Sequence, residues 1–382
     1  MPFDFDTVID RAASDSRKWR KYAGRDVLPL WIADMDFAAP PAVTAALRAR
    51  VDCGIFGYGD LTEKLVESFR DYCRRRYRWE VKPEWLFWLP GLVCGLNVTA
   101  RAYGTPGEEI ISCTPIYQHF REAAVNQGQT HKPVPFVRHG ARWEIDFDAL
   151  ERTVTSRTRQ LTFCSPHNPL GRAFSRAELE RVAALCLRHN LILTSDDIHC
   201  DLVLDDTPHV PFATLAPEIA ARTVTLMAPS KTYNIPGLGC SVAIIPDPEL
   251  RKRYDRAAAG IVPDVNLLGL VAGEAAWRHG EPWRQALLAY LRGNRDLLQD
   301  FVAHELPGVS MTPVEATYLA WLDVSALQLE APQKFFEQHG VGLLEGAIYG
   351  APRGHFVRLN FGCRRATLAE ALARMKRAVA AR

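Results

Sequence analysis

The sequence predicts an α/β protein with a mainly parallel sheet covered by helices on both faces, plus a second, smaller α+β lobe. Between residues 85 and 245, short apolar runs alternate with amphipathic helical patterns. From about residue 269 onward, longer helical patterns and then a strand-rich stretch replace this alternation. The 382 residues are also too many for one simple core. We therefore expect a large domain over residues 41–270 and a small domain formed by residues 1–40 and 271–382.

Two helices and a glycine-rich loop precede the first predicted strand. A helix begins at Pro40-Pro41, a position at which proline is tolerated. A second helix spans residues 62–77 and carries its apolar residues on one face. Between them lies Phe56-Gly57-Tyr58-Gly59. The flanking glycines leave the ring of Tyr58 little cover from its own chain.

The strands of the predicted sheet are short and rich in β-branched and other apolar residues. They are residues 85–89, 109–112, 130–136, 160–164, 191–194, 223–226 and 241–245. A helix after the fourth strand begins with Ser175 and Glu178, the two positions of a capping box. The second lobe is predicted to contain helices and strands in that order: residues 270–278, 283–304, 317–322 and 356–361.

The turn after the first strand has the pattern of a phosphate-binding site. Pro90-Gly91 ends the strand, and a helical pattern starts at Leu92. A glycine turn that leads into a helix aims free backbone N–H groups at whatever lies above it. Many α/β connections share this pattern, so it gains meaning only together with other residues.

Chemically versatile residues follow the carboxyl ends of several predicted strands, the edge at which ligands bind in such sheets. These residues are Gly91, Tyr117, Asn168, Asp196 and Lys231. A lysine after a buried strand has its charged form disfavoured, and a neutral amine is a nucleophile toward carbonyls. Each residue alone has a simpler explanation: a solvated lysine, a turn asparagine or a helix-capping aspartate. Their joint occurrence at one sheet edge favours a functional site.

Pyridoxal 5′-phosphate is a cofactor that uses all of these groups. A lysine forms a Schiff base with its aldehyde, and an acid keeps its pyridine nitrogen protonated as an electron sink. A stacking aromatic ring and a phosphate-binding helix start complete the set. The sequence therefore predicts a site for this cofactor around Lys231.

At this point the chain resembles the pyridoxal-phosphate C–S lyases, the cystathionine β-lyase and cysteine-S-conjugate β-lyase branch of the class I/II aminotransferase superfamily. The matching segments, in order, are Trp31-Ile32-Ala33-Asp34-Met35-Asp36-Phe37, Ser165-Pro166-His167-Asn168-Pro169, Ser195-Asp196-Asp197-Ile198-His199, Ala228-Pro229-Ser230-Lys231-Thr232-Tyr233-Asn234 and Val357-Arg358-Leu359-Asn360-Phe361-Gly362. The resemblance covers nearly the whole chain. It implies fold type I with a seven-stranded sheet in the large domain, and β-elimination of sulfur amino acids to a thiol, pyruvate and ammonia.

The resemblance also implies roles for catalytic residues and for the cofactor ring. Lys231 matches the Schiff-base lysine, which also removes the substrate Cα proton. Asp196 matches the partner of the pyridine nitrogen, whereas Asp197 lies where the family often has glutamate. Asn168 and His199 are expected near the ring oxygen. Tyr117 is expected to stack on the ring.

Further residues are implied for the phosphate, the substrate and the partner subunit. Around the phosphate, the resemblance points to Gly91, Leu92, Val93 and Ser230. Arg358 would bind the substrate carboxylate bidentately, with Asn168 beside it. Tyr58 matches a tyrosine that reaches the cofactor and substrate of the neighbouring subunit, which implies a homodimer with shared active sites.

Departures from the family pattern bear on the type of reaction. Leu170 stands where threonine is usual, and Ser165 opens a motif that often opens with asparagine; both concern shape. Ala228 stands three residues before the lysine, where transaminases more often have a hydroxyl residue, and Pro229 matches the lyase branch. This favours a lyase. A class I/II aminotransferase, and a regulatory protein that binds pyridoxal phosphate and has side lyase activity, remain the alternatives.

Composition and charge argue against several other classes. The formal net charge of +2 does not indicate a nucleic-acid partner. No apolar run is long enough to span a bilayer, and the acidic N-terminus is unlike a signal peptide. His167, His199 and Asp201 match no strong metal-ligand spacing, so no metal is expected. Nine dispersed cysteines without a C-x-x-C pair favour a reducing compartment, and we expect a cytoplasmic protein.

Overall fold

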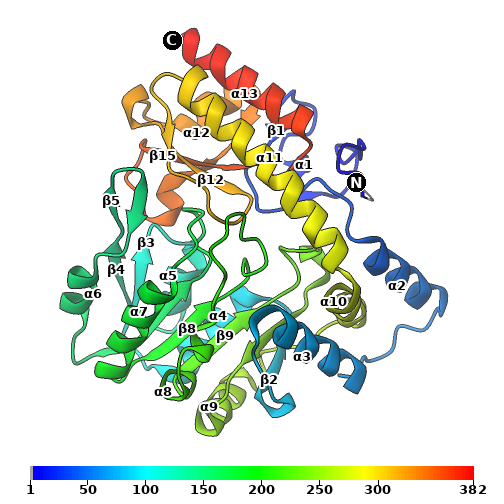
Figure 1. Cartoon of the computed structure of the whole chain (residues 1–382), viewed down its shortest axis with the longest axis vertical. Coiled ribbons are helices and arrows are strands. Elements are labelled where there is room, and N and C mark those ends of the chain that lie inside the picture. Colours follow the sequence, from blue (N-terminus) through cyan, green and yellow to red (C-terminus); the bar gives the residue numbers. More distant parts are fainter. Residues whose placement is uncertain (1–2) are drawn as a thin grey trace.

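The computed structural model describes residues 3–382 and contains a large lobe built on one seven-stranded sheet (Figure 1). Its strands, in spatial order, are β2 (Leu86–Leu89), β10 (Ser241–Ile244), β9 (Thr223–Met227), β8 (Ile192–Asp196), β7 (Thr158–Cys164), β3 (Glu109–Thr114) and β4 (Thr130–Pro135). Strand β10 is antiparallel to both neighbours, and the other pairs are parallel. The predicted mainly parallel α/β sheet is confirmed.

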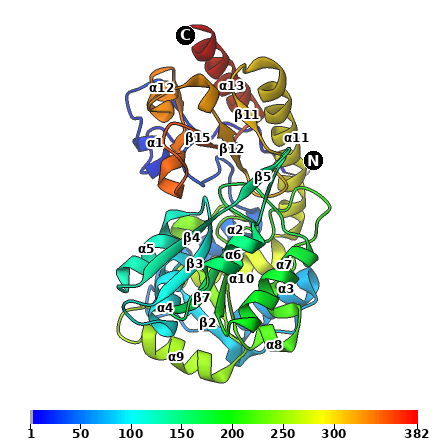
Figure 2. The ribbon, with the colours of Figure 1, turned by 90° about the vertical axis from the view of Figure 1, so that its left-hand side faces the viewer.

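Helices cover both faces of this sheet, which is why its central strands are buried on both sides (Figure 2). On one face lie α4 (Leu92–Tyr103), α5 (Gln118–Asn126) and α9 (Pro248–Ala258). The other helices of the lobe are α2 (Pro41–Asp52), α3 (Glu63–Tyr77), α6 (Phe147–Thr153), α7 (Arg176–Arg188), α8 (Pro217–Ala220) and α10 (Leu267–His279). Ser175 and Glu178 form the predicted capping box of α7.

The small lobe is built on an antiparallel sheet of four strands. In spatial order they are β11 (Ser310–Met311), β12 (Leu319–Asp323), β15 (Phe356–Asn360) and β14 (Leu344–Glu345). The remaining elements are α1 (Arg17–Arg20), β1 (Leu28–Pro29), β5 (Val137–His139), β6 (Arg142–Glu144), α11 (Glu281–Glu305), α12 (Pro332–Gln338), β13 (Val341–Gly342) and α13 (Arg365–Ala380). In Figure 1, α11 begins near α10 and runs along the small lobe.

The N-terminal segment packs on the small lobe, where β1 pairs in parallel with β13. This pairing agrees with a discontinuous small domain, although the domain boundaries at residues 40 and 270 stay a prediction. One strand starts later than the sequence indicates: β12 begins at Leu319 and not at Thr317. Thr317 has a φ of 72°, outside the β region, and its hydroxyl accepts a hydrogen bond from the N–H of Leu319.

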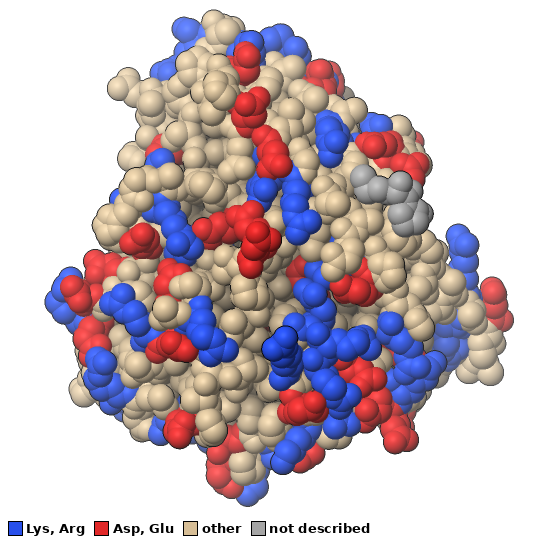
Figure 3. All heavy atoms as spheres, in the orientation of Figure 1, with Lys and Arg blue, Asp and Glu red and all other residues tan. Residues whose placement is uncertain are grey.

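The surface carries charged side chains of both signs. On the face shown in Figure 3, basic and acidic side chains are interspersed. Among residues 3–382, the longest apolar helical stretches fall short of what a membrane span requires. Within the same residues, His, Cys, Asp and Glu side chains form no group of three or more that could hold a metal ion.

Helix α3 is anchored to the loop after β8 by one buried carboxylate. Asp201 accepts hydrogen bonds from the hydroxyl groups of Tyr72 at 2.7 Å and Tyr77 at 2.8 Å, and from Nε of Arg76 at 3.1 Å. We expect Asp201→Ala to lower the free energy of unfolding by about 3 kcal/mol, because it removes the acceptor that the buried hydroxyl groups and Arg76 share and leaves Arg76 only a distant carboxylate, that of Glu281. Urea denaturation measures this, with the exposed Asp206→Ala as control. Equal stability of the two variants would contradict the assignment.

Candidate active site

The amine of Lys231 lies just beyond strand β9, at the junction of the two lobes. Its Nζ donates a hydrogen bond to the carbonyl oxygen of Ala33 at 2.7 Å. Burial lowers the pKa of Lys231 to about 8; Arg358 acts in the same direction, whereas Asp34 and Asp196 act against it. At pH 7 roughly a tenth of this amine is therefore neutral, far more than of an ordinary lysine, and this fraction can act as a nucleophile or a general base.

Asp196 ends strand β8 as a buried carboxylate that forms no salt bridge within residues 3–382. It accepts a hydrogen bond from the N–H of Ile198 at 3.1 Å. Burial raises its pKa to about 7, and Asp197 adds to this, whereas the Ile198 bond and Lys231 act against it. The neighbouring Asp197 is engaged elsewhere, with Nε2 of His209 at 2.8 Å and the hydroxyl of Ser195. Asp196 is thus the acid that is free to pair with a cationic ligand atom.

Arg358, on β15 of the small lobe, is joined to Asn168 of the large lobe. Its Nη1 donates to Oδ1 of Asn168 at 2.9 Å, and its Nη2 donates to the carbonyl oxygen of Trp31 at 3.0 Å. Its Nε is buried and has no partner among the described residues. The guanidinium also lies 5.2 Å from the ring centre of Tyr349. A buried cation with no carboxylate partner in the described chain can take the carboxylate of a ligand.

Tyr117 and His199 complete the cluster. Burial raises the pKa of Tyr117, and Asp196 acts in the same direction, whereas Arg358 acts against it. Burial lowers the pKa of His199 to about 3, with Lys231, Arg358 and His167 contributing. His199 is therefore neutral, and its Nδ1 has no partner among the described residues. The structure thus brings Lys231, Asp196, Asn168, Arg358, Tyr117 and His199 together, as the sequence predicts.

The proposed phosphate site lies at the start of α4. Gly91 is the residue that precedes the helix, and the space beside its Cα is open, since no atom lies within 4 Å of where a Cβ would stand. The side chain of Leu92 is buried in the core, so only its backbone could serve a ligand, whereas Val93 is partly exposed. Ser230 directly precedes Lys231. The roles of these four residues stay predictions.

Tyr58 is an expected site residue that no contact within the single chain joins to the cluster. Its side chain is fully exposed on the loop between α2 and α3. A contact of Tyr58 with a site would therefore need a second copy of the chain. That role also stays a prediction.

Sequence reasoning left one part of the site without a role: residues 31–37, which we call the strap. Its carbonyl groups accept hydrogen bonds from the site itself, since Lys231 bonds to Ala33 and Arg358 bonds to Trp31. Asn360 donates to two further carbonyl groups, those of Ile32 and Asp34. The strap therefore holds the lysine and the arginine before a ligand arrives.

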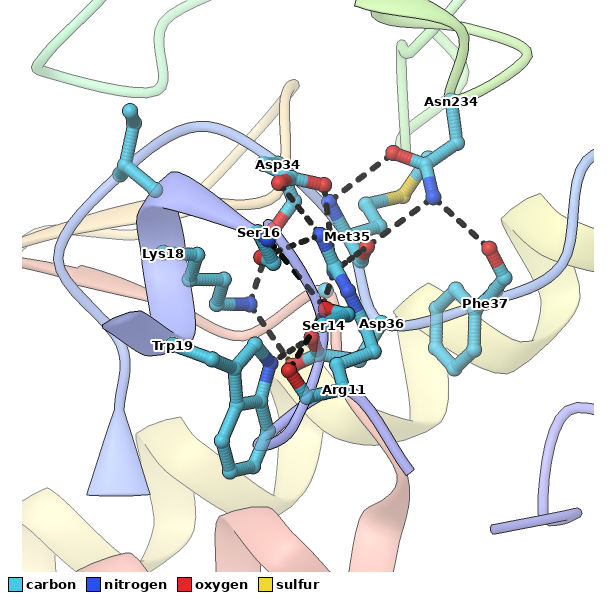
Figure 4. A network of polar contacts seen from close by, with 12 residues as sticks. Arg11, Ser14, Ser16, Lys18, Trp19, Asp34, Met35, Asp36, Phe37 and Asn234 are labelled. Atoms are coloured by element: carbon cyan, nitrogen blue, oxygen red, sulfur yellow. Dashed lines mark hydrogen bonds and ion pairs between the residues drawn. The ribbon is translucent and has the colours of Figure 1, made fainter. Parts of the chain in front are cut away.

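A partly buried network of charges holds the strap in turn (Figure 4). Arg11 pairs with Asp34 at 2.8 Å and with Asp36 at 2.9 Å. Lys18, a fully buried lysine, pairs with Asp36 at 2.7 Å. The indole of Trp19 donates to Asp36 at 3.0 Å. Two aspartates within the apolar run of the strap were the only sequence signal for this network.

The whole chain can be compared with known proteins. A model of the family described as aminotransferase class I and II matches residues 25–375. The chain belongs to this family. Its members depend on pyridoxal 5′-phosphate, which confirms the cofactor and the fold type expected from the sequence.

Several individual relatives are similar to this chain over nearly its whole length. The cystathionine beta-lyase PatB of Bacillus subtilis is 37% identical, over 98% of this chain and 100% of the relative. The crystal structure of a protein named OvoB has a TM-score of 0.96 and 48% identity, over 99% of both chains. Cystalysin of Treponema denticola, whose structure contains pyridoxal 5′-phosphate, has a TM-score of 0.95 and 30% identity over the full length of both chains.

The residues of this family member fit the cofactor. The buried carboxylate of Asp196 lacks a salt-bridge partner within residues 3–382, which suits the pyridinium nitrogen. The lowered pKa of Lys231 suits the amine that bonds the cofactor aldehyde, and the open space at Gly91 suits a phosphate at the start of a helix. Three of the four groups that the cofactor uses, the lysine, the acid and the helix start, thus fit it, and Tyr117 is the candidate for the fourth, the stacking ring.

Proposed function

We propose that this chain is a C–S lyase that uses pyridoxal 5′-phosphate to eliminate the thiol from a sulfur amino acid, giving a thiol, pyruvate and ammonia. The observation that supports it most is the partly buried Lys231 amine, whose lowered pKa responds to both Asp196 and Arg358, in a chain that matches a cystathionine beta-lyase over 98% of its length. L-Cystathionine is the first substrate to test. Cystine or another cysteine S-conjugate fits the same residues.

Each residue has a defined task in this reaction. Lys231 would hold the cofactor through its aldehyde, Asp196 its pyridine nitrogen, Tyr117 its ring face, and Asn168 and His199 its ring oxygen. The bound cofactor supplies an electron sink for the carbanion formed at the substrate Cα.

Arg358 would bind the substrate, and Lys231 would also remove its proton. Arg358 would bind the substrate carboxylate with both of its Nη atoms, in place of its present bonds to Asn168 and Trp31. Lys231 Nζ would take the Cα proton, because its lowered pKa leaves it partly neutral near pH 7. The thiolate then leaves from Cβ. In a transaminase the same proton would return to the cofactor, so its destination decides the type of reaction.

The proposal includes a homodimer with shared active sites. Its support is an exposed group of apolar side chains around Tyr58 that no part of residues 3–382 covers. The group comprises Val51, Ile55, Phe56, Tyr58 and Leu61. Exposed apolar surface of this kind marks interaction sites in monomers. We also propose a cytoplasmic location, because all nine cysteines are free thiols, as in a reducing compartment.

The presence or absence of a keto acid distinguishes the two reactions. Purified protein loaded with pyridoxal 5′-phosphate is incubated with L-cystathionine and no keto acid. We expect pyruvate and homocysteine in equal amounts. Product that forms only after a keto acid is added would identify a transaminase instead, and the absence of product from any sulfur amino acid would refute the proposed function.

A further inference from the structure

A second buried carboxylate, that of Asp197, lies directly after Asp196 in the chain. Its backbone N–H donates to the carbonyl oxygen of Leu226 at 2.9 Å, and this bond fixes Asp197 against strand β9. Its carboxylate accepts hydrogen bonds from the hydroxyl of Ser195 and from Nε2 of His209, the latter at 2.8 Å. None of these partners belongs to the candidate active site, so direct contact with a ligand does not explain why this carboxylate is buried.

The charge of Asp197 acts on Asp196. Burial raises the pKa of Asp196 to about 7, with a further contribution from the charge of Asp197, whereas a backbone N–H and Lys231 act against both. Tyr117 and Cys164 are the other titratable groups whose pKa values respond to Asp196, and burial raises the pKa of each, so both stay neutral near pH 7. Two adjacent carboxylates in a dry site attract a cation or a proton more strongly than one does. A cationic ring nitrogen beside Asp196 therefore gains from the charge of Asp197.

His209 is the only basic side chain paired with Asp197 within residues 3–382. The side chain of His209 is 3% exposed, and that of Asp197 is fully buried. The ring of Tyr77 packs edge-on against the imidazole, with 5.4 Å between the ring centres. Hydrogen bonds to a carboxylate favour its charged form, and a buried carboxylate that lacks donors takes up a proton instead. His209 therefore maintains the charge that acts on Asp196.

The other charged groups near His209 do not replace it. His209 lines a hollow of about 250 Å³ between α3, α11 and the loop after β8, whose other charged residues are Arg76, Asp201, Asp205, Asp206, Arg284 and Arg292. Arg76 is paired with Asp201 at 3.1 Å, and Arg284 is paired with Glu281 at 2.6 Å. Nε of Arg292 donates to a backbone carbonyl group at 2.6 Å. These arginines thus have partners of their own, and none of them is paired with Asp197.

We propose that His209 is a positioning residue for the cofactor ring, which acts through Asp197 to strengthen the hold of Asp196 on the protonated pyridine nitrogen. Asp196 alone would contact the ring, and the other two residues act through it. The proposal goes beyond the reaction proposed above and does not depend on its type, because a lyase and a transaminase need the same cationic ring.

The dissociation constant of pyridoxal 5′-phosphate, measured on cofactor-free protein at pH 5.5 and pH 8.5 without substrate, tests this. At pH 8.5 Asp196 of the free protein has lost its proton, so binding of the ring takes up one proton, which the charge of Asp197 favours. Asp197→Asn keeps the shape of the side chain and removes its charge. It should weaken binding about tenfold at pH 8.5, the factor that one pKa unit represents. Binding at pH 5.5 should change little, because Asp196 is largely protonated there already.

Two variants of His209 complete the test. His209→Leu removes the donor and should show the same weakening at pH 8.5 alone, whereas His209→Gln keeps an N–H donor and should bind the cofactor like the unmodified protein. Lys231 also titrates in this range, but Asp197 is not among the charges that act on it, so its contribution is common to all variants. The matched control is His304→Leu, since His304 is an exposed histidine of α11 that is paired with Asp300. It should leave both dissociation constants unchanged.

Weakening by the same factor at both pH values would mark a merely structural role and overturn the proposal. An Asp197→Asn or His209→Leu variant that binds the cofactor normally at pH 8.5 would overturn it as well. Carbon-13 NMR of the aspartate carboxyl groups in cofactor-free protein is a second measurement, with the Asp196 signal identified from Asp196→Asn. This signal should titrate at lower pH in Asp197→Asn and His209→Leu, and an unchanged midpoint would contradict the proposal. Neither measurement involves turnover, so a failure of the proposed elimination and a failure of this proposal are distinguishable.

Discussion

Replacing Lys231 by alanine is expected to abolish pyruvate formation. The variant loses the amine that holds the cofactor aldehyde and the base that takes the Cα proton. Loss of a positioned base alone lowers a rate about 10²–10⁴-fold, and loss of the covalent link to the cofactor adds to this. Steady-state pyruvate release measures the effect at saturating cofactor, and circular dichroism verifies that the variant is folded.

The matched control for this change is Lys252→Ala. Lys252 lies on α9 with a side chain that is 70% exposed, so its loss should leave the rate unchanged. A Lys231→Ala variant that stays within tenfold of the unmodified rate would show that another residue serves as base.

Asp196→Asn is expected to lower kcat about 10²–10³-fold, the usual cost of removing one preorganised electrostatic partner. An amide cannot keep the pyridine nitrogen protonated, so carbanion charge can no longer spread into the ring. The KM for substrate should change little, because Asp196 faces the cofactor. Asp255→Asn, an exposed change on α9, is the control. A variant with normal kcat would mean that the site uses no cationic ring.

The raised pKa of Asp196 predicts that the free energy of unfolding of the cofactor-free protein depends on pH. The pKa of Asp196 is raised from 3.8 to about 7, so between these values the folded chain holds a proton that the unfolded chain has lost. The contribution of Asp196 to the free energy of unfolding therefore falls as the pH rises through this window. Urea denaturation at pH 5 and pH 7 should show a smaller loss of stability in Asp196→Asn. Identical pH profiles would argue against a protonated Asp196.

The sheet and most of the site could be predicted because both depend on local sequence. Strands of this sheet are buried on both faces, so they read as continuous apolar runs. Lys231, Asp196 and Asn168 each follow such a run, and parallel strands bring their carboxyl ends to one edge. Arg358 comes from the other lobe, and only the resemblance to a known family assigned it to the same site.

Features formed by residues distant in sequence could not be predicted. The bond from Lys231 to Ala33 joins residues 198 positions apart, and that from Arg358 to Trp31 joins residues 327 positions apart. No periodicity or turn signal encodes such pairs. The late start of β12 depends on a φ of 72° at Thr317, which β-branched residues rarely adopt.

Reduction of the cofactor-loaded protein with borohydride, followed by peptide mapping, tests the central claim most directly. The reagent makes a bond between a lysine and the cofactor permanent. We expect one modified peptide, with the pyridoxyl group on Lys231, and loss of the visible absorption band. A cofactor attached to another lysine, or protein that binds none even at excess cofactor, would contradict the active site described above.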